Sequence, residues 1–186
     1  MFLRSCNARV LPALFFVVSV PLYAASVEEI VNYLEYSEIL SSSGQPSESQ
    51  LRTLKNVGFE RIVFLAFSDS NGSIANEDSK VEELGMDFVH IPVDWDSPRE
   101  SDFYTFAAAL GRDPGKRTLV HCQVNFRASA FSFLYRVLYE DVDIGEAKRD
   151  MESVWVPNET WRRLIFAILE ENAVSPHCDN CLWSSD

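Results

Sequence analysis

The sequence is short of positive charge. Its 186 residues contain 16 Lys and Arg against 28 Asp and Glu, which gives a formal net charge of −12 at pH 7. A surface with this excess of negative charge repels nucleic acids and anionic lipids at long range. We therefore expect no nucleic-acid partner, and a phosphorylated substrate would need positive charge that is focused in one pocket.

Long apolar runs are also scarce, and the one present lies near the N-terminus. Residues 10–24, "VLPALFFVVSVPLYA", follow Arg4 and Arg9 and are too few to span a bilayer comfortably. A basic segment, a short apolar run and small residues after it are typical of a signal peptide. We predict cleavage after Ala24, with an uncleaved N-terminal anchor as the alternative. The protein is then exported to the periplasm or secreted, and no other run is long enough for an integral membrane span.

Internal repeats and linker-like stretches are missing too, which argues against several domains. Removal of a signal peptide at residues 1–24 leaves 162 residues, sufficient for one domain with its own core. We predict this domain at residues 25–175, followed by a short cysteine-containing tail at residues 176–186.

Cysteine is rare, with four in the whole chain. Cys6 leaves with the signal peptide, so Cys122, Cys178 and Cys181 remain. An odd number in an oxidising compartment indicates one disulfide and one free thiol. We expect a local disulfide between Cys178 and Cys181 and a free thiol at Cys122. Zinc binding with His177 is an alternative that needs a fourth ligand, and thiol–disulfide exchange of the pair with Cys122 is a further hypothesis.

Apolar runs of strand length alternate with amphipathic segments along the rest of the chain. We expect strands at residues 37–43, 61–67, 86–93 and 117–122, and helices at 26–36, 48–58, 79–85, 102–111, 128–140, 144–153 and 158–173. This alternation predicts an α/β fold, a three-layer sandwich with a small, mostly parallel sheet flanked by helices. Ligands bind beyond the carboxyl ends of the strands in such sheets. Two loops with reactive residues are expected to converge there, "DWDSP" and "CQVNFR".

The second of these loops begins with Cys122, where a strand runs into a helix. Backbone N–H groups and the positive end of the helix dipole at such a corner bind anions and favour the thiolate form of a cysteine. Arg127 brings a planar guanidinium suited to two oxygens of an oxyanion. His121 is expected behind the loop, with its ring bonded to the backbone so that it fixes the loop shape. Each residue alone is ordinary in a core or on a surface, but the combination at this corner indicates catalysis or anion binding.

The chain resembles the dual-specificity branch of the protein tyrosine phosphatase superfamily in "HCQVNFRAS", "SSSGQPSESQLRTLKNVGFERIVFL" and "HIPVDWDSP". It is most similar to the bacterial beta-lactamase-hydrolase-like phosphatases, and the similarity spans roughly residues 37–170. The resemblance implies a dual-specificity-phosphatase-like fold and a reaction that needs no metal ion or cofactor. It also implies Cys122 as nucleophile, Arg127 as phosphate clamp, and Asp94 or Asp96 as general acid.

The cysteine loop departs from the usual pattern of that superfamily. It has four residues between cysteine and arginine where five are usual, contains no glycine, and has Ala128 after the arginine in place of Ser or Thr. Asn125 is the loop residue that best tolerates a left-handed conformation, and Ser129 is a candidate for the missing hydroxyl. The expected phosphate-binding residues are Gln123, Val124, Asn125, Phe126 and Arg127. A loop of this size also occurs in rhodanese-type sulfurtransferases, so a Cys122 persulfide is one alternative, and an inactive binder of phosphate or phosphoproteins is another.

The acid loop favours phosphatase chemistry. Cleavage of a phosphoester by a thiolate expels an alkoxide or phenoxide, so it needs a proton donor, whereas persulfide transfer needs none. Asp94 is the first choice because it follows the strand most directly. Asp96 is the second, and both carboxylates have the simpler reading of turn or capping residues. We expect hydrolysis of a phosphomonoester, on a small molecule or a phosphoprotein, through a cysteinyl-phosphate, and the sequence leaves the substrate and the oligomeric state open.

Overall fold

The computed structural model of the chain describes residues 26–177 and Trp183. Its five-stranded sheet has the order β1-β2-β5-β3-β4, with β2, β5, β3 and β4 parallel and β1 antiparallel to β2. The strands are β1 (Leu34–Glu35), β2 (Leu40–Ser43), β3 (Arg61–Phe64), β4 (Asp87–His90) and β5 (Thr118–His121). All four predicted strands are therefore confirmed, and β1 is an addition.

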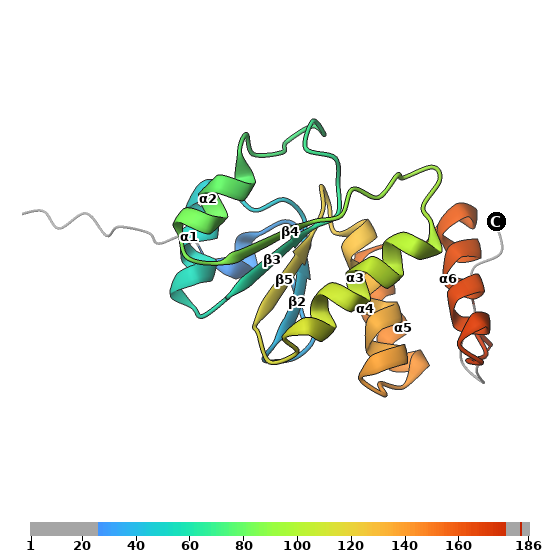
Figure 1. Cartoon of the computed structure of the whole chain (residues 1–186). Coiled ribbons are helices and arrows are strands. Elements are labelled where there is room, and N and C mark those ends of the chain that lie inside the picture. Colours follow the sequence, from blue (N-terminus) through green and yellow to red (C-terminus); the bar gives the residue numbers. More distant parts are fainter. Residues whose placement is uncertain (1–25, 178–182, 184–186) are drawn as a thin grey trace, which may run out of the picture.

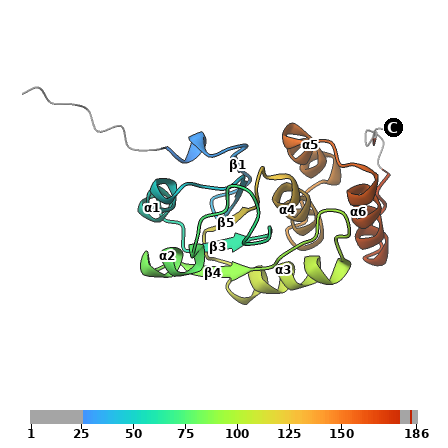
Figure 2. The same cartoon turned by 90° about the horizontal axis from the view of Figure 1, so that it is seen from above.

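Helices cover both faces of this sheet, as Figures 1 and 2 show. They are the 3₁₀ turn η1 (Val27–Glu29) and the helices α1 (Glu48–Asn56), α2 (Glu77–Glu83), α3 (Glu100–Arg112), α4 (Phe126–Tyr139), α5 (Ile144–Val154) and α6 (Glu159–Glu171). Helices α1 and α2 lie on one face, and α3 to α6 lie on the other. The predicted α/β fold with a mostly parallel sheet between helices is confirmed.

The four parallel strands end at one level. His121 at the end of β5 pairs with Ser43 of β2 and with Phe64 of β3, and Phe64 pairs with His90 of β4. The segments that follow these four residues consequently leave the sheet along the same edge, which is where α/β sheets bind ligands.

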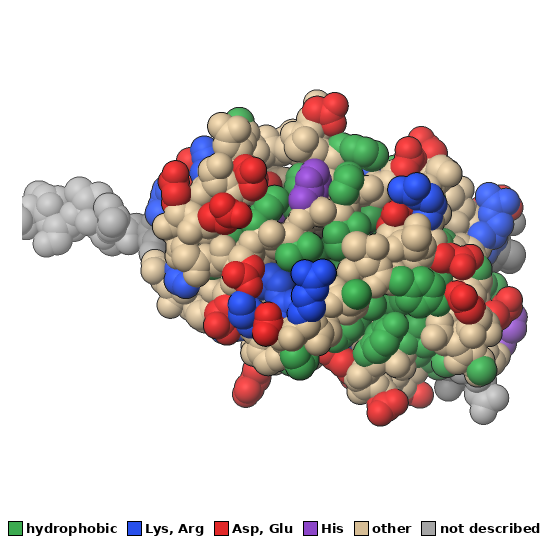
Figure 3. All heavy atoms as spheres, viewed as in Figure 1, with side chains coloured by type: hydrophobic (Ala, Val, Ile, Leu, Met, Phe, Trp, Pro, Cys, Tyr) green, Lys and Arg blue, Asp and Glu red, His purple; other side chains and the backbone are tan. Residues whose placement is uncertain are grey.

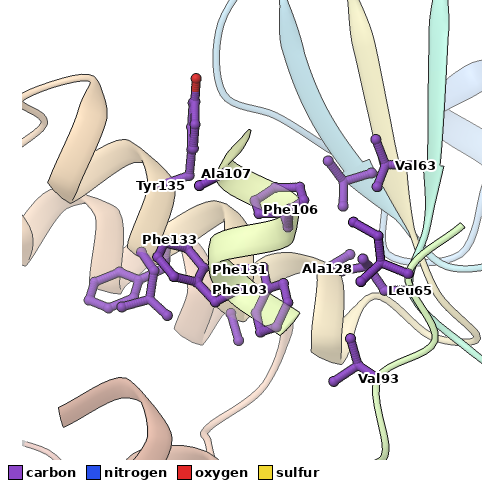
Figure 4. Close-up of a cluster of buried hydrophobic side chains, with 14 of the residues drawn as sticks. Val63, Leu65, Val93, Phe103, Phe106, Ala107, Ala128, Phe131, Phe133 and Tyr135 are labelled. Atoms are coloured by element: carbon purple, nitrogen blue, oxygen red, sulfur yellow. The ribbon is translucent and has the colours of Figure 1, made fainter. Parts of the chain in front are cut away.

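The larger core lies between the sheet and α3 to α6. Figure 4 shows aromatic rings of α3 and α4 gathered there, with Phe131 of α4 5.6 Å from both Phe103 and Phe106 of α3. Replacement of a buried phenylalanine by alanine costs about 3–5 kcal/mol. This packing fixes the direction of α4, and therefore the position of its first turn at the sheet edge.

Helix α1 shows how local sequence sets an element. The Ser47 hydroxyl accepts from the Gln50 amide at 3.3 Å, and the Gln50 side chain accepts from the Ser47 amide at 2.8 Å, which together form a capping box. Gly58 follows the helix with φ of +95°, a conformation suited to glycine.

The helix predicted at residues 26–36 is wrong. The short turn η1 and strand β1 form there instead, and Asn32 between them is left-handed with φ of +50°. The Val31 carbonyl accepts the amide of Gly44 at 2.7 Å, so this segment follows the end of β2. Tertiary hydrogen bonds here outweigh the helical pattern of the sequence. A smaller correction concerns α3, which continues through Gly111 to Arg112.

Acidic side chains are scattered over the face seen in Figure 3, in keeping with the net charge. Within residues 26–177, none of the helices combines the length and the apolar character that a bilayer span needs. The predicted signal peptide lies outside the described residues, and so do Cys178 and Cys181 with their expected disulfide.

Candidate active site

Cys122 follows β5, the strand at the centre of the sheet. Its thiol is free and fully buried in the larger core, and its amide donates to the Ser43 carbonyl at 3.3 Å. Helix α4 begins four residues later at Phe126. Because the first N–H groups of a helix lack partners within it, this corner offers donors to an anion.

Two asparagines shape the loop in place of glycines. Asn125 is left-handed, with φ of +73° and ψ of 0°, as the sequence suggests. Its side-chain amide donates to the Asn32 carbonyl at 2.6 Å, and the Asn32 side chain donates to the Val124 carbonyl at 2.9 Å. These two hydrogen bonds hold the loop at Val124 and Asn125. Asn32, which takes part in both, lies in the segment at residues 26–36 that was predicted to be helical.

The end of β2 supports the same loop from another side. The Gln45 amide donates to the Gln123 carbonyl at 3.1 Å, and Gly44 forms an isolated bridge with Val124. A Cβ at Gly44 would lie 2.9 Å from the Gln123 carbonyl oxygen and 3.0 Å from Cβ of Val31. Glycine is required here because the two backbones approach so closely.

Arg127 joins the cysteine loop to the acid loop. It is 7% exposed, its Nε donates to the Val93 carbonyl at 3.0 Å, and its Nη1 donates to the Gln123 side chain at 3.4 Å. Its guanidinium also lies 5.4 Å from the centre of the Trp95 ring. The first turn of α4 thus carries a buried cation that bonds to both loops.

The two candidate acids come soon after Val93, Asp94 as the next residue and Asp96 two residues later. One oxygen of the Asp94 carboxylate, Oδ1, accepts from the amides of Asp96 at 2.8 Å and Ser97 at 3.0 Å. Asp94 therefore stabilises the turn that follows Val93, as aspartates in turns commonly do. No hydrogen bond joins its Oδ2 to the described residues, and both Asp94 and Asp96 are exposed. Both remain candidates for the general acid.

An aromatic wall borders the mouth of the loop. A cavity of about 340 Å³ is lined by Trp95, Gln123, Val124, Phe126 and Arg127. The Phe126 ring stacks on Trp155 with 4.8 Å between the ring centres, and Trp95 lies 5.3 Å from Trp155. The Trp95 carbonyl accepts from the Trp161 indole at 3.0 Å, which ties the acid loop to α6. Cys122 is fully buried and is not part of the lining of this cavity.

Solved structures with this fold include a candidate phosphatase of the DUF442 group from Shewanella putrefaciens CN-32. It is 31% identical, the match covers 78% of this chain and 96% of that one, and the TM-score is 0.72. This chain belongs to the DUF442 group of candidate phosphatases. With them it falls in the dual-specificity-like branch of the protein tyrosine phosphatase superfamily.

More distant structures show the same fold. TpbA of P. aeruginosa, solved in complex with pTyr, is 15% identical over 81% of this chain and 94% of that one, with a TM-score of 0.60. A candidate phosphatase from Neisseria meningitidis Z2491 is 20% identical over 74% and 98% of the two chains, with a TM-score of 0.58. No family model matches the sequence, and no match was found among the curated proteins.

Two supporting residues of this DUF442 chain have partners other than those expected. His121 lies behind the loop, but its ring makes no hydrogen bond to the loop backbone. It stacks on Phe64 with 4.7 Å between the ring centres and faces Glu77, whose Oε1 is 3.3 Å from Nε2. The Ser129 hydroxyl donates to the Phe126 carbonyl at 3.1 Å and accepts from the Trp155 indole at 3.1 Å.

Sequence reasoning missed several residues that hold the cysteine loop, namely Asn32, Gly44, Gln45, Asn71 and Glu77. The Gln123 side chain donates to the Asn71 carbonyl at 3.4 Å, and Gln45 donates to Glu77. The alternation of side chains along β5 accounts for the direction of His121. Leu119 belongs to the core under α1 and α2, so His121, two residues on, must face that side and away from Cys122.

Proposed function

We propose that this DUF442 protein hydrolyses a phosphomonoester through a cysteinyl-phosphate on Cys122. One observation carries the proposal: buried Arg127 bonds to the loop of the candidate acids at Val93 and to the cysteine loop at Gln123. A guanidinium in this place neutralises the charge of the phosphoryl group. Asp94, one of the two candidate acids, directly follows Val93, to which Arg127 is bonded. Membership in a phosphatase family supports the same reaction class.

In the proposed reaction the Cys122 thiolate attacks phosphorus, an S–P bond forms and the P–O bond to the leaving group breaks. Asp94 or Asp96 gives its proton to the departing oxygen. Water then attacks phosphorus and returns a proton to the same carboxylate. The P–S bond breaks, which releases phosphate and restores the thiolate.

The aromatic wall supports an aryl or otherwise apolar leaving group. Trp95 and Phe126 line the mouth beside Arg127, so a substrate ring would bury apolar surface against them while its phosphate faces the loop. The related TpbA was solved with pTyr, which has this combination of ring and phosphate.

A phosphate binder without turnover is the second candidate function. The observation in its favour is that Cys122 is 0% exposed and lies outside the lining of the mouth. In such a protein the loop amides and Arg127 would hold an anion that the sulfur does not reach.

Phosphate release from an aryl phosphate, with and without vanadate, tests the two candidates. The proposal expects vanadate-sensitive release by the wild type and none by Cys122→Ser, with tungstate binding kept in that variant. Binding of tungstate without release by the wild type would establish the binder instead. Thiosulfate-to-cyanide transfer, measured in parallel, would reveal a sulfurtransferase.

We also propose export of the protein, with residues 1–24 removed as a signal peptide. The support is the basic segment and short apolar run in the sequence. Mass spectrometry of the mature protein should find an N-terminus at Ala25, and an intact Met1 would refute cleavage.

A further inference from the structure

Glu77, the first residue of α2, is a buried carboxylate with an unusual set of partners. Its side chain is 4% exposed, and within the described residues no Lys or Arg pairs with it. A buried carboxylate needs hydrogen bonds or a positive charge to offset its lost hydration. Gln45 donates hydrogen bonds to Glu77, and the ring of His121 lies beside it. Both residues belong to segments that adjoin the cysteine loop.

Gln45 connects Glu77 to the loop directly. Its side-chain amide lies 2.9 Å and 3.0 Å from the two carboxylate oxygens of Glu77, and its backbone amide donates to the Gln123 carbonyl at 3.1 Å. A trans peptide directs its carbonyl and its N–H to opposite sides. Holding the Gln123 carbonyl at Gln45 therefore turns the N–H of Val124 to the other side of the loop.

His121 gives Glu77 a second connection to the same loop. Its Nε2 is 3.3 Å from Oε1 of Glu77, and it directly precedes Cys122 in the chain. The ring is held from the other side by Phe64, which stacks in turn on His90 with 5.0 Å between the ring centres. Glu77 thus contacts the residue before Cys122 directly, and it is linked through Gln45 to the carbonyl of Gln123, the residue after Cys122.

The need to fill space does not explain why a carboxylate is found at position 77. Glu77 borders a surface hollow of about 570 Å³ that Phe64, Ile74 and His90 also line, so it is not enclosed by packed apolar side chains. An apolar residue of similar size would fit there without the penalty of a buried charge.

We propose that Glu77 is a positioning residue, which holds the cysteine loop in its oxyanion-binding shape through Gln45 and His121. The inference rests on the proposed function of Cys122 and Arg127, and adds that α2 sets the loop's affinity for a tetrahedral anion. It also explains how a loop without glycine keeps one shape, because residues outside the loop hold its carbonyls.

Three variants test the proposal: Glu77→Leu, Gln45→Met, and the two combined. Each should weaken tungstate binding by roughly tenfold or more, since small displacements of catalytic groups have effects of this size. The double variant should bind no more weakly than Glu77→Leu alone, because Gln45→Met removes a contact that Glu77→Leu has already removed. Its melting temperature should stay near that of the wild type, since replacing both partners of a buried polar pair by apolar groups is nearly neutral.

Binding can be followed by tryptophan fluorescence, since Trp95 lies beside Arg127. Glu83→Leu is a matched control on the exposed side of α2 and should leave tungstate affinity unchanged. A double variant with wild-type affinity, or single losses that add in the double variant, would overturn the proposal. A wild type that does not bind tungstate would defeat the proposed function itself, whereas wild-type turnover with an unaffected Glu77→Leu variant defeats the positioning role alone.

Discussion

Gly44 lies so close to Gln123 that a Cβ on the glycine would be 2.9 Å from the carbonyl oxygen of Gln123. Gly44→Ala must therefore displace the cysteine loop or the end of β2. We expect a loss of about 1–3 kcal/mol in the free energy of unfolding, typical of overpacking. We also expect a larger relative loss of phosphate release, because the displaced loop no longer surrounds the phosphate.

Gly111→Ala is the matched control for this substitution. Gly111 lies in the last turn of α3, and a Cβ there would meet nothing within 4 Å. Alanine in a helix is more stable than glycine by roughly 0.5–1 kcal/mol, so this variant should be slightly stabilised and fully active. Urea unfolding and turnover on one aryl phosphate measure both effects, and equal behaviour of the two variants would contradict the close approach at Gly44.

Arg127→Lys separates positive charge from geometry. Lysine keeps the charge but cannot donate to the Val93 carbonyl and to an oxyanion with one planar group. We expect kcat to fall roughly 10²–10³-fold, as when a preorganised donor to the transition state is removed. Tungstate affinity should fall as well, and a lysine variant with near wild-type kcat would show that charge alone suffices.

The elements with strong local signals could be predicted from the sequence. The capping box of α1 at Ser47 and Gln50 and the continuous apolar run of β3 depend on neighbouring residues only, and the helix and the strand both formed as expected. The segment at residues 26–36 has a helical pattern too, but its Val31 carbonyl is taken by Gly44. No local rule contains that contact, because it joins segments that only the folded sheet brings together.

The same division applies to the candidate site. Cys122, Asn125 and Arg127 could be predicted as site residues from the sequence. A reactive cysteine, an asparagine that tolerates a left-handed conformation and an anion-binding arginine occur together where a strand runs into a helix. Glu77 and Gln45 could not, since a lone acid in a polar loop and a glutamine in a turn are common anywhere in a sequence. Only the tertiary structure shows that their side chains meet behind the loop.

Tyr36 gives the protein a specific sensitivity to alkali. Burial of its hydroxyl, which lies 2.7 Å from the Ser42 hydroxyl, raises the pKa of Tyr36 from 10.0 to about 12. Because the folded pKa exceeds the unfolded one, the stabilisation is complete below pH 10 and is lost as the pH rises toward 12. The expected loss at pH 11 is about 1.4 kcal/mol.

Urea unfolding of the wild type and Tyr36→Phe between pH 8 and pH 11 measures this loss. The variant should be less stable by about 1 kcal/mol at pH 8, where it lacks one hydrogen bond. The difference should shrink or reverse by pH 11. Tyr139→Phe, at a position that is 52% exposed, is the control and should show no such change. A constant difference between wild type and Tyr36→Phe would refute the assignment.

Asp94→Asn and Asp96→Asn decide which residue is the general acid. Asparagine at position 94 keeps an oxygen that can accept from the amides of Asp96 and Ser97, so the turn is preserved while the proton donor is lost. The variant of the true acid should lose about 10²–10⁴-fold in kcat on phenyl phosphate. It should lose far less on 2,4-dinitrophenyl phosphate, whose leaving group needs little protonation. We expect Asp94→Asn to show this pattern, and the pH–rate profile of that variant should lack the decline at high pH, because no acid remains to be deprotonated. A pattern that appears only in Asp96→Asn would assign the proton to Asp96 and leave Asp94 as the residue that shapes the turn.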